Sequence, residues 1–287
     1  AAALKGPGGS AVIPGDTILL TKPYLQNVQP DGISVMWELS AEATCQLEYG
    51  PDANYGTSAN IVTDVSGAST VIYKAVLTGL QPDSVYHYRL WLDGKPQSDR
   101  TFATAPLHHT NFAFGVWGDS QGTNHGLFPD DPFEPTKKMM VHMANQVDFG
   151  VAVGDMAEDG SSYGDTRVYY LDRVAELLGQ KVPWFVAWGN HDQGSSSVIR
   201  KFSDLPSQFR GGQYHAGFGS YSFEYAGCHF LCIDDADSFD RVWIEADLRR
   251  ATLPVARVRG GDRHRVVTAV RCVAIPLRTD LEALPVR

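Results

Sequence analysis

The sequence predicts two domains, an all-β sandwich followed by an α/β domain, because two different patterns divide the chain. Between residues 17 and 105, short stretches alternate apolar and polar residues with period two, and Gly, Pro, Asp and Asn turns separate them. This alternation is typical of antiparallel strands that bury one face. From about residue 110, continuous apolar runs alternate with helical patterns, which is typical of α/β domains. A length of 287 residues also favours two domains over one.

The first domain, over residues 17–105, carries a specific sandwich feature besides its alternation. Residues 80–86 (LQPDSVY) match a tyrosine corner, in which the hydroxyl of Tyr86 ties a crossover between sheets to the backbone. Residues 104–110 (TAPLHHT) follow and are expected to form a solvated linker to the second domain. His108 and His109 lie in it and could bind a metal, but we favour a solvated linker because neighbouring side chains of an extended chain point apart.

Three apolar runs of the second domain, at residues 112–117, 149–153 and 184–188, are each followed by a short polar turn. Runs of this kind predict strands that are buried on both faces of a sheet. The turns are Gly118-Asp119-Ser120-Gln121, Gly154-Asp155 and Gly189-Asn190-His191-Asp192. Because parallel strands present their carboxyl ends at one edge, these side chains are expected to converge. Two carboxylates, an amide and an imidazole that converge are costly to bury without a cation, so a metal site is predicted. The alternative is three ordinary turns in which Asn and Asp are favoured.

Further elements of the second domain follow from helical and strand patterns. Helices are predicted over residues 134–146, 166–178 and 241–250, with Asp165 as the N-cap of the second. Residues 221–225 and 229–234 predict a hairpin that turns at Ala226-Gly227.

Taken in order, the three turns resemble the motifs of the calcineurin-like metallophosphoesterase superfamily. The first domain is similar to the fibronectin type III-like domain of purple acid phosphatases, in particular at residues 23–26 (PYLQ) and 31–37 (DGISVMW). The resemblance implies an αββα metallophosphoesterase sandwich over residues 110–250. It also implies a phosphoester hydrolase that uses two divalent or mixed-valence metal ions, Fe, Zn or Mn, to activate water for attack on phosphorus.

The resemblance also assigns roles to the residues of the three turns. Asp119 serves one ion, Asn190 serves the other and Asp155 bridges both, while Gln121 stands where many members have a histidine ligand. His191 would stabilise charge on the phosphoryl oxygens or protonate the leaving alcohol, and Asp192 would orient it.

The second turn continues into an acidic loop. Glu158 occupies the position of a tyrosine that binds ferric iron in purple acid phosphatases, which argues against the purple form. Glu158 and Asp159 are extra ligands or, as we favour, part of a solvated acidic loop.

The resemblance stops near residue 251. Two further histidine motifs that the superfamily places after this point are not found, and residues 249–287 contain nine Arg and no Lys. This composition suggests a shifted reading frame or a truncated gene product, and residues 251–287 are treated as an atypical Arg-rich tail. The fold is therefore expected to be incomplete at its C-terminus. An alternative function follows, a truncated or non-catalytic relative that acts only as a binding module.

The overall composition and charge limit which binding partners and which cellular location the sequence predicts. A net charge of −9 argues against a non-specific nucleic-acid binder. The sequence contains no run of eighteen apolar residues, so it predicts no membrane-spanning helix. The first residues have no signal-peptide pattern, although the resemblance implies an extracytoplasmic or secreted protein. Cys45, Cys228, Cys232 and Cys272 have no zinc-type spacing, and nothing in the sequence indicates an oligomeric state.

Overall fold

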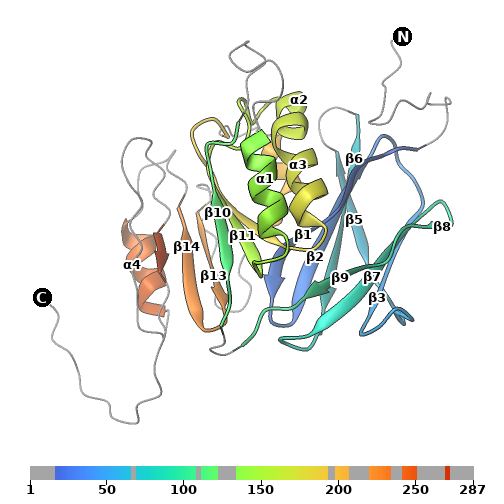
Figure 1. Cartoon of the computed structure of the whole chain (residues 1–287), viewed down its shortest axis with the longest axis horizontal. Coiled ribbons are helices and arrows are strands. Elements are labelled where there is room, and N and C mark those ends of the chain that lie inside the picture. The colour runs from blue at the N-terminus through green and yellow to red at the C-terminus, as the bar shows by residue number, and fades with distance from the viewer. Residues whose placement is uncertain are drawn as a thin grey trace, which may run out of the picture.

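The computed structural model describes residues 17–65, 69–107, 111–121, 134–192, 198–206, 220–233, 241–250 and 269–271. The described strands form three sheets, and the largest sheet, with seven strands, contains strands from both halves of the chain (Figure 1). The predicted fold class, a β-sandwich followed by an α/β part, is confirmed.

The N-terminal half is a sandwich of two antiparallel sheets. One sheet contains β1 (Leu19–Gln29), β2 (Gly32–Leu39), β6 (Val71–Thr78) and β5 (Ile61–Val65). The other contains β4 (Thr57–Ser58), β3 (Cys45–Gly50), β7 (Val85–Leu92), β8 (Lys95–Pro96) and β9 (Arg100–Ala103). The hydroxyl of Tyr86 accepts the Gln81 N–H at 2.9 Å, so the predicted tyrosine corner is confirmed.

The three apolar runs form parallel strands that are neighbours in the large sheet. These strands are β10 (Phe114–Trp117), β11 (Phe149–Val153) and β12 (Trp184–Ala187), and their order is β10-β11-β12. The prediction of burial on both faces is wrong for β10, in which Val116 is 47% exposed. On its other side, β12 pairs in parallel with β1, with Gln26 opposite Trp184. The sequence did not indicate this pairing. Because of it, the first strand of the sandwich is also a strand of the α/β sheet.

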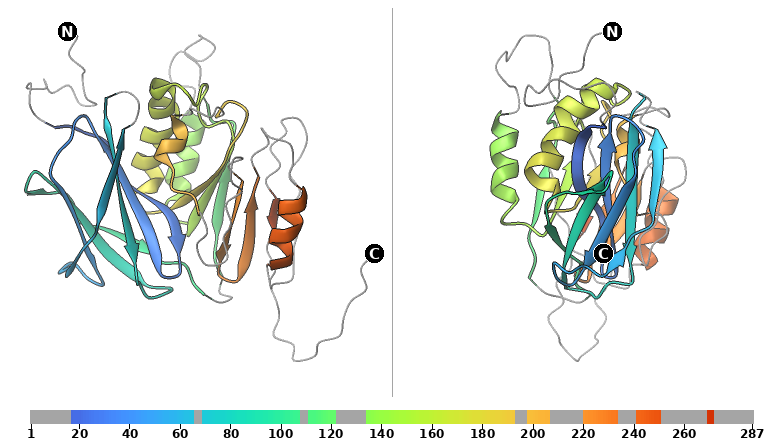
Figure 2. Two further views of the ribbon diagram at one scale, coloured as in Figure 1. Left: turned by 180° about the vertical axis from the view of Figure 1, so that it is seen from behind. Right: turned by 90° about the vertical axis from the view of Figure 1, so that its right-hand side faces the viewer.

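Helices cover one face of this sheet (Figure 2). They are α1 (Glu134–Met143) and one continuous helical run through α2 (Tyr163–Asp165), η1 (Thr166–Leu171), α3 (Asp172–Val174) and η2 (Ala175–Gly179). The run begins three residues before the predicted start, because the side chain of Ser162 caps it by accepting the Asp165 N–H at 3.2 Å. The prediction of Asp165 as the N-cap is therefore wrong.

The opposite face of β10–β12 is covered by a smaller sheet, with a helix outside it (Figure 2). This sheet contains β13 (Tyr221–Tyr225), β14 (Cys228–Cys232) and β15 (Ala269–Arg271), and the helix is α4 (Arg241–Arg250). The hairpin turns at Ala226 and Gly227, whose φ angles of 48° and 75° suit a tight two-residue turn. Ala269–Arg271 of the predicted tail pair with β14, and the rest of residues 251–287 lies outside the described residues.

A buried charge cluster fastens α4 to the hairpin. His229 lies 2.7 Å from Glu224 Oε1 and 2.8 Å from Asp247 Oδ2, and the Ser222 hydroxyl donates to Asp247 Oδ1 at 2.9 Å. Burial alone would lower the pKa of His229, but the hydrogen bonds to the two carboxylates outweigh it and raise the pKa to about 9. We therefore expect a protonated His229 to hold helix and hairpin together.

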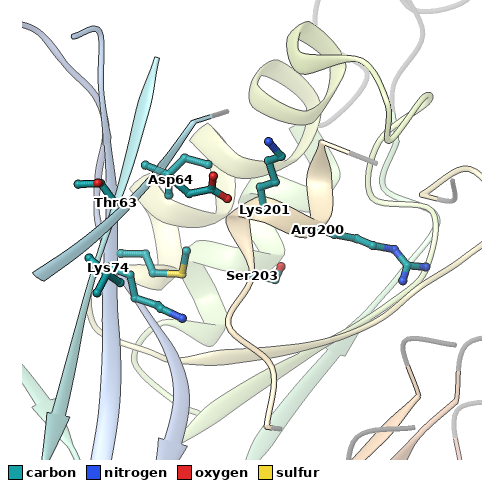
Figure 3. A pocket seen from close by; sticks show the side chains of 9 residues that line it. Thr63, Asp64, Lys74, Arg200, Lys201 and Ser203 are labelled. Atoms are coloured by element: carbon teal, nitrogen blue, oxygen red, sulfur yellow. The ribbon is translucent and has the colours of Figure 1, made fainter. Parts of the chain in front are cut away.

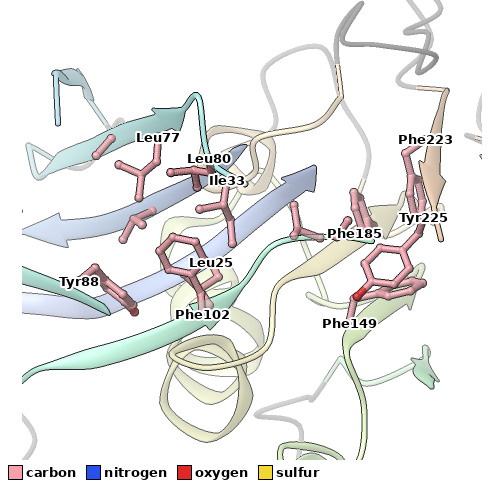
Figure 4. Close-up of a cluster of buried hydrophobic side chains, with 14 of the residues drawn as sticks. Leu25, Ile33, Leu77, Leu80, Tyr88, Phe102, Phe149, Phe185, Phe223 and Tyr225 are labelled. Atoms are coloured by element: carbon pink, nitrogen blue, oxygen red, sulfur yellow. The ribbon is translucent and has the colours of Figure 1, made fainter. Parts of the chain in front are cut away.

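One apolar core crosses from the sandwich into the α/β half (Figure 4). Leu25, Tyr88 and Phe102 belong to it on the sandwich side, and it continues to Phe149, Phe185 and Phe223 on the other. Phe185 and Phe223 stack with their ring centroids 3.6 Å apart.

The expected linker lies partly inside this core. Thr104 and Ala105 are buried, the Ala105 N–H bonds to the Gln29 carbonyl at 3.1 Å, and the Pro106 carbonyl accepts the Ala226 N–H at 3.2 Å. The prediction of a solvated linker is therefore wrong for its first three residues. His108 and His109 lie outside the described residues.

Candidate metal centre

The three polar turns lie side by side at one edge of the central sheet. They follow β10, β11 and β12, which are parallel and in register, with Trp117 opposite Ala152 and Val153 opposite Ala187. Their polar groups therefore emerge together at the carboxyl ends of the strands, where open α/β sheets place their binding sites.

Two of the turns hold an aspartate in an uncommon backbone conformation. Asp119 has φ 48° and Asp155 has φ 50°, both in the left-handed region that aspartate tolerates better than most residues. A strained backbone of this kind persists only where the surroundings fix it, and it is concentrated at functional sites. Its occurrence at equivalent places in adjacent turns marks this edge as the candidate site.

Backbone hydrogen bonds join the first turn to the second. The Asp119 N–H donates to the Gly154 carbonyl at 3.1 Å, and the N–H groups of Ser120 and Gln121 both donate to the Asp155 carbonyl at 3.0 Å. These bonds fix the position of the first turn relative to Asp155.

The Asp155 carboxylate lies between the second and third turns. The residue is 2% exposed, and its Oδ1 accepts the backbone N–H of His191 at 2.9 Å. A Cβ on Gly189 would stand only 2.2 Å from this same Oδ1, so the carboxylate lies in space that only glycine leaves open.

Asp192 connects the third turn to the residues that directly follow the second turn. Its buried carboxylate accepts backbone N–H groups from Met156 at 3.0 Å, Ala157 at 3.3 Å and Gly189 at 3.0 Å. Burial raises the pKa of Asp192 to about 6, against the lowering effect of these three donors.

The imidazole of His191 is oriented by a main-chain carbonyl. Its Nδ1 lies 2.8 Å from the Glu158 carbonyl oxygen, which can only accept, so Nδ1 carries the proton and Nε2 is directed elsewhere. The bond to Glu158 raises the pKa of His191, and the charges of Asp155, Glu158 and Asp192 add to this against the effect of burial. No side-chain pattern could have indicated this contact with the Glu158 carbonyl, and the orienting role of Asp192 stays a prediction.

The remaining predicted ligands are accessible or lack a partner. Asp119 and Asn190 are exposed. Gln121 Oε1 is buried and has no hydrogen-bond partner among the described residues. A buried acceptor without a donor is costly, and a cation would satisfy it. Like the Asp155 carboxylate, these side chains offer oxygen atoms, the ligand type that hard cations such as Mn²⁺ prefer, and their role as metal ligands stays a prediction.

The two acidic residues of the following loop differ in their partners. Glu158 Oε1 lies 3.9 Å from His191 Nδ1, so this carboxylate lies beside the site. The Asp159 carboxylate accepts from the N–H and the hydroxyl of Ser161 at 2.8 and 2.6 Å, which fits the loop role favoured by the sequence. Within the described part of the chain, no group of three His, Cys, Asp or Glu side chains is arranged to hold a metal ion.

The architecture is an α/β sheet with three polar turns at the carboxyl ends of its strands, preceded by an N-terminal β-sandwich. Residues 87–268 match the calcineurin-like phosphoesterase family, and residues 21–105 match the N-terminal domain of purple acid phosphatases. The chain belongs to the calcineurin-like phosphoesterase family, whose members are metal-dependent hydrolases.

Individual relatives are phosphatases. The chain is 28% identical over 193 residues to Purple acid phosphatase 18 of Arabidopsis thaliana, which is 62% of this chain and 40% of that protein. It is 29% identical over 83 residues to Phosphatase DCR2 of Saccharomyces cerevisiae, which is 29% of this chain and 14% of that protein.

A solved structure has the same fold. It is the purple acid phosphatase PPD1 from seeds of yellow lupin (Lupinus luteus), with a TM-score of 0.60 and 18% identity. The match covers 79% of this chain and 48% of the lupin chain. The chain thus spans less than half the length of the Arabidopsis and lupin phosphatases.

None of the helices among the described residues combines the length and the apolar character that crossing a bilayer requires.

Proposed function

We propose that this chain forms part of a phosphoester hydrolase in which Asp119, Gln121, Asp155 and Asn190 hold two metal ions, of Fe, Zn or Mn. The observation that carries the proposal is the position of Asp155. Its main-chain carbonyl accepts from the first turn and its carboxylate accepts from the third, so all three turns meet at Asp155, whose carboxylate is buried. A carboxylate at such a junction suits a bridging role, because a bridge must reach both ions and offset their repulsion.

The ions, when bound, supply the Lewis acidity that activates water and stabilises an in-line displacement at phosphorus. The chain itself supplies positioning and a proton. His191 Nε2 is directed away from the Glu158 carbonyl. In the protonated imidazolium, which the raised pKa of His191 favours, Nε2 can donate a hydrogen bond to a phosphoryl oxygen or a proton to the leaving alcohol. Asp192 acts through the backbone, since its bonds to Met156, Ala157 and Gly189 hold the turn that carries His191.

The substrate we propose is a small phosphoester, and nucleic acid is disfavoured by the net charge of −9. Glu158 stands where purple acid phosphatases carry the tyrosine that binds ferric iron, so the loaded protein is expected to lack their colour. The family likeness also favours an extracytoplasmic location.

A non-catalytic binding module remains the second candidate. It is favoured by the sparse donor set, since no three His, Cys, Asp or Glu side chains come together among the described residues. Metal content separates the two candidates. Close to two ions per chain supports the hydrolase, and a chain that stays metal-free after reconstitution supports the module.

The decisive experiment measures metal content and turnover of aryl phosphate mono- and diesters with Mn²⁺, Zn²⁺ and Fe²⁺. The control is Asp155→Asn, which keeps an oxygen that can accept the His191 N–H but removes the charge between the ions. We expect this variant to lose metal and turnover together. Full metal content and full activity in Asp155→Asn would refute the bridging role.

A further inference from the structure

A tyrosine hydroxyl ties each end of the helical run from Tyr163 to Gly179 across the boundary between the sandwich and the α/β half. At the start of the run, the Tyr163 hydroxyl donates to Glu38 Oε1 in β2 at 2.7 Å. Just past its end, the hydroxyl of Tyr88 in β7 donates to the Gln180 carbonyl at 3.1 Å. The two bonds therefore cross the same boundary at opposite ends of one helical run.

The carboxylate of Glu38 is a fixed point in the sandwich. Its side chain is buried, and the hydroxyls of Thr70 and Thr21 donate to its Oε1 and Oε2. Arg167 Nε lies 3.6 Å from the same Oε2. A buried carboxylate needs such donors, and a group with partners on both oxygens is held in one position. The bond from Tyr163 therefore anchors the start of the helical run to the sandwich.

The loop of residues 158–162 lies between this anchor and His191. Its Glu158 carbonyl accepts from the imidazole, and its Gly160 N–H donates to the His191 carbonyl at 2.9 Å. A Cβ on Gly160 would stand 2.6 Å from the Asp192 carbonyl oxygen, so the loop is packed directly against the third turn. Because the loop contacts both the main chain and the imidazole of His191, a displacement of the loop also displaces the imidazole.

Hydrogen bonds within the loop connect it to the helical run. The Asp159 carboxylate accepts from the N–H and the hydroxyl of Ser161, and the Asp159 carbonyl accepts the Ser162 N–H at 2.9 Å. Ser162 in turn caps the helix that begins at Tyr163. The position of Tyr163 is therefore passed on to the residues that contact the third turn.

The 3-10 helix η3 (Ile199–Phe202) supports the loop from another side, because its first N–H group donates to the Gly160 carbonyl at 3.0 Å. This helix faces β5 and β6 across a cavity of about 410 Å³ (Figure 3). Its last residue is tied to the sandwich by the Tyr24 hydroxyl, which donates to the Phe202 carbonyl at 2.9 Å. Because of this second support, we expect loss of the Tyr163 hydroxyl to loosen the loop without releasing it.

We propose that Tyr163 is a positioning residue for His191. Its hydrogen bond to Glu38 fixes the loop of residues 158–162 against the third turn, and the loop holds the imidazole with the proton on Nδ1. Nε2 is thereby kept directed away from the Glu158 carbonyl. The catalytic consequence of this positioning rests on the proposed hydrolase function, whereas the orientation of the imidazole does not.

The test compares Tyr163→Phe with Tyr88→Phe, a matched removal of one hydroxyl at the other end of the same helical run. The ratio of the Nδ1–H to the Nε2–H tautomer of His191 is measured by ¹⁵N NMR, with His191→Gln identifying the signals. The full chain is kept metal-free in chelator, at a pH where the imidazole is neutral. A carbonyl at Nδ1 keeps the proton there, and a released imidazole distributes it over both nitrogens.

We expect Tyr163→Phe to lower this tautomer ratio about fivefold, less than the full effect of a hydrogen bond to a charged group because η3 still supports the loop. Tyr88→Phe should leave the ratio unchanged, although thermal unfolding should show a similar loss of stability in both variants. Glu38→Gln keeps an oxygen that can accept the Tyr163 hydroxyl, so it should preserve the ratio. The proposal fails if Tyr163→Phe leaves the ratio unchanged, or if Tyr88→Phe or Glu38→Gln lowers it as much as Tyr163→Phe does.

Turnover of an aryl phosphate by the metal-loaded chain gives a second measurement. Tyr163→Phe should lower kcat about fivefold with KM nearly unchanged, because a misplaced proton donor affects the transition state more than substrate binding. An equal kcat for Tyr163→Phe and Tyr88→Phe in an active protein would overturn the positioning role. If the unaltered chain shows no turnover while the tautomer ratios behave as expected, the hydrolase proposal fails and the positioning of His191 by Tyr163 stands.

Discussion

Gly189→Ala tests how tightly the third turn is packed against the second. A Cβ at this position would stand 2.2 Å from Asp155 Oδ1, 2.5 Å from Asp155 N and 2.9 Å from Asp155 Cγ. One of these atoms belongs to the backbone and cannot be relieved by a rotamer change. The carboxylate can move only by giving up the bond to the His191 N–H.

The expected cost follows from these distances. Overpacking a tight site typically costs about 1–3 kcal/mol, and the backbone contact places this change at or above the upper end. At roughly 2–4 °C per kcal/mol, a loss of ~3 kcal/mol lowers Tm by roughly 6–12 °C. Displacing the Asp155 carboxylate should also remove metal, beyond any effect on stability.

The matched control is Gly164→Ala, within α2. The nearest atom to a Cβ there is Ser162 Oγ at 3.9 Å, an ordinary contact. Alanine is favoured over glycine in helices by about 1 kcal/mol, so this variant should keep or slightly raise Tm. The assay is thermal unfolding together with metal content after reconstitution with Mn²⁺. If Gly189→Ala matched Gly164→Ala in both measurements, the close packing of Gly189 on Asp155 would be refuted.

Three other predictions follow from single contacts. Tyr24→Phe leaves the Phe202 carbonyl without its 2.9 Å hydrogen bond and should cost about 1–3 kcal/mol, which urea unfolding will detect or exclude. Because the folded pKa of His229 is raised to about 9, its stabilising effect is complete below pH ~6.5 and is lost as the pH rises through 9. The urea midpoint should fall over this range, and His229→Gln should remove that dependence. Glu158→Ala keeps the main-chain carbonyl that orients His191 but removes the carboxylate 3.9 Å from its Nδ1. Turnover should therefore survive with the pKa of His191 lowered, and a large loss of turnover would assign the orienting role to the side chain.

The strands and turns of the α/β half could be predicted from the sequence because their signals are local. An apolar run that is buried on both faces specifies a parallel strand, and a Gly-Asp pair specifies the turn that ends it. The structure places the three runs as neighbours in one sheet, with Asp155 buried between their turns. The tyrosine corner of Tyr86 was predictable for the same reason, since its partner Gln81 is five residues away.

Other contacts could not be predicted, because they join segments that are distant in the sequence or involve main-chain atoms. The parallel pairing of β1 with β12 places Gln26 opposite Trp184, and the residue pattern of neither strand indicates which strand it pairs with. The orientation of His191 depends on a carbonyl of Glu158, and any residue at that position supplies a carbonyl. The burial of Ala105 in the expected linker depends on its bond to Gln29.

The shared sheet changes how the sandwich should be regarded. Where a self-contained α/β domain would have an edge at β12, this chain places β1, and the rings of Tyr24 and Trp184 lie 5.2 Å apart beside that junction. The Tyr24 hydroxyl then reaches the Phe202 carbonyl in η3. Removing residues 17–105 would leave β12 with an unpaired side and Trp184 without its aromatic neighbour, and exposed strand edges invite aggregation. The sandwich is therefore a structural part of the sheet that carries Asp119, Asp155 and Asn190, because the strand before Asn190 is held in place by β1.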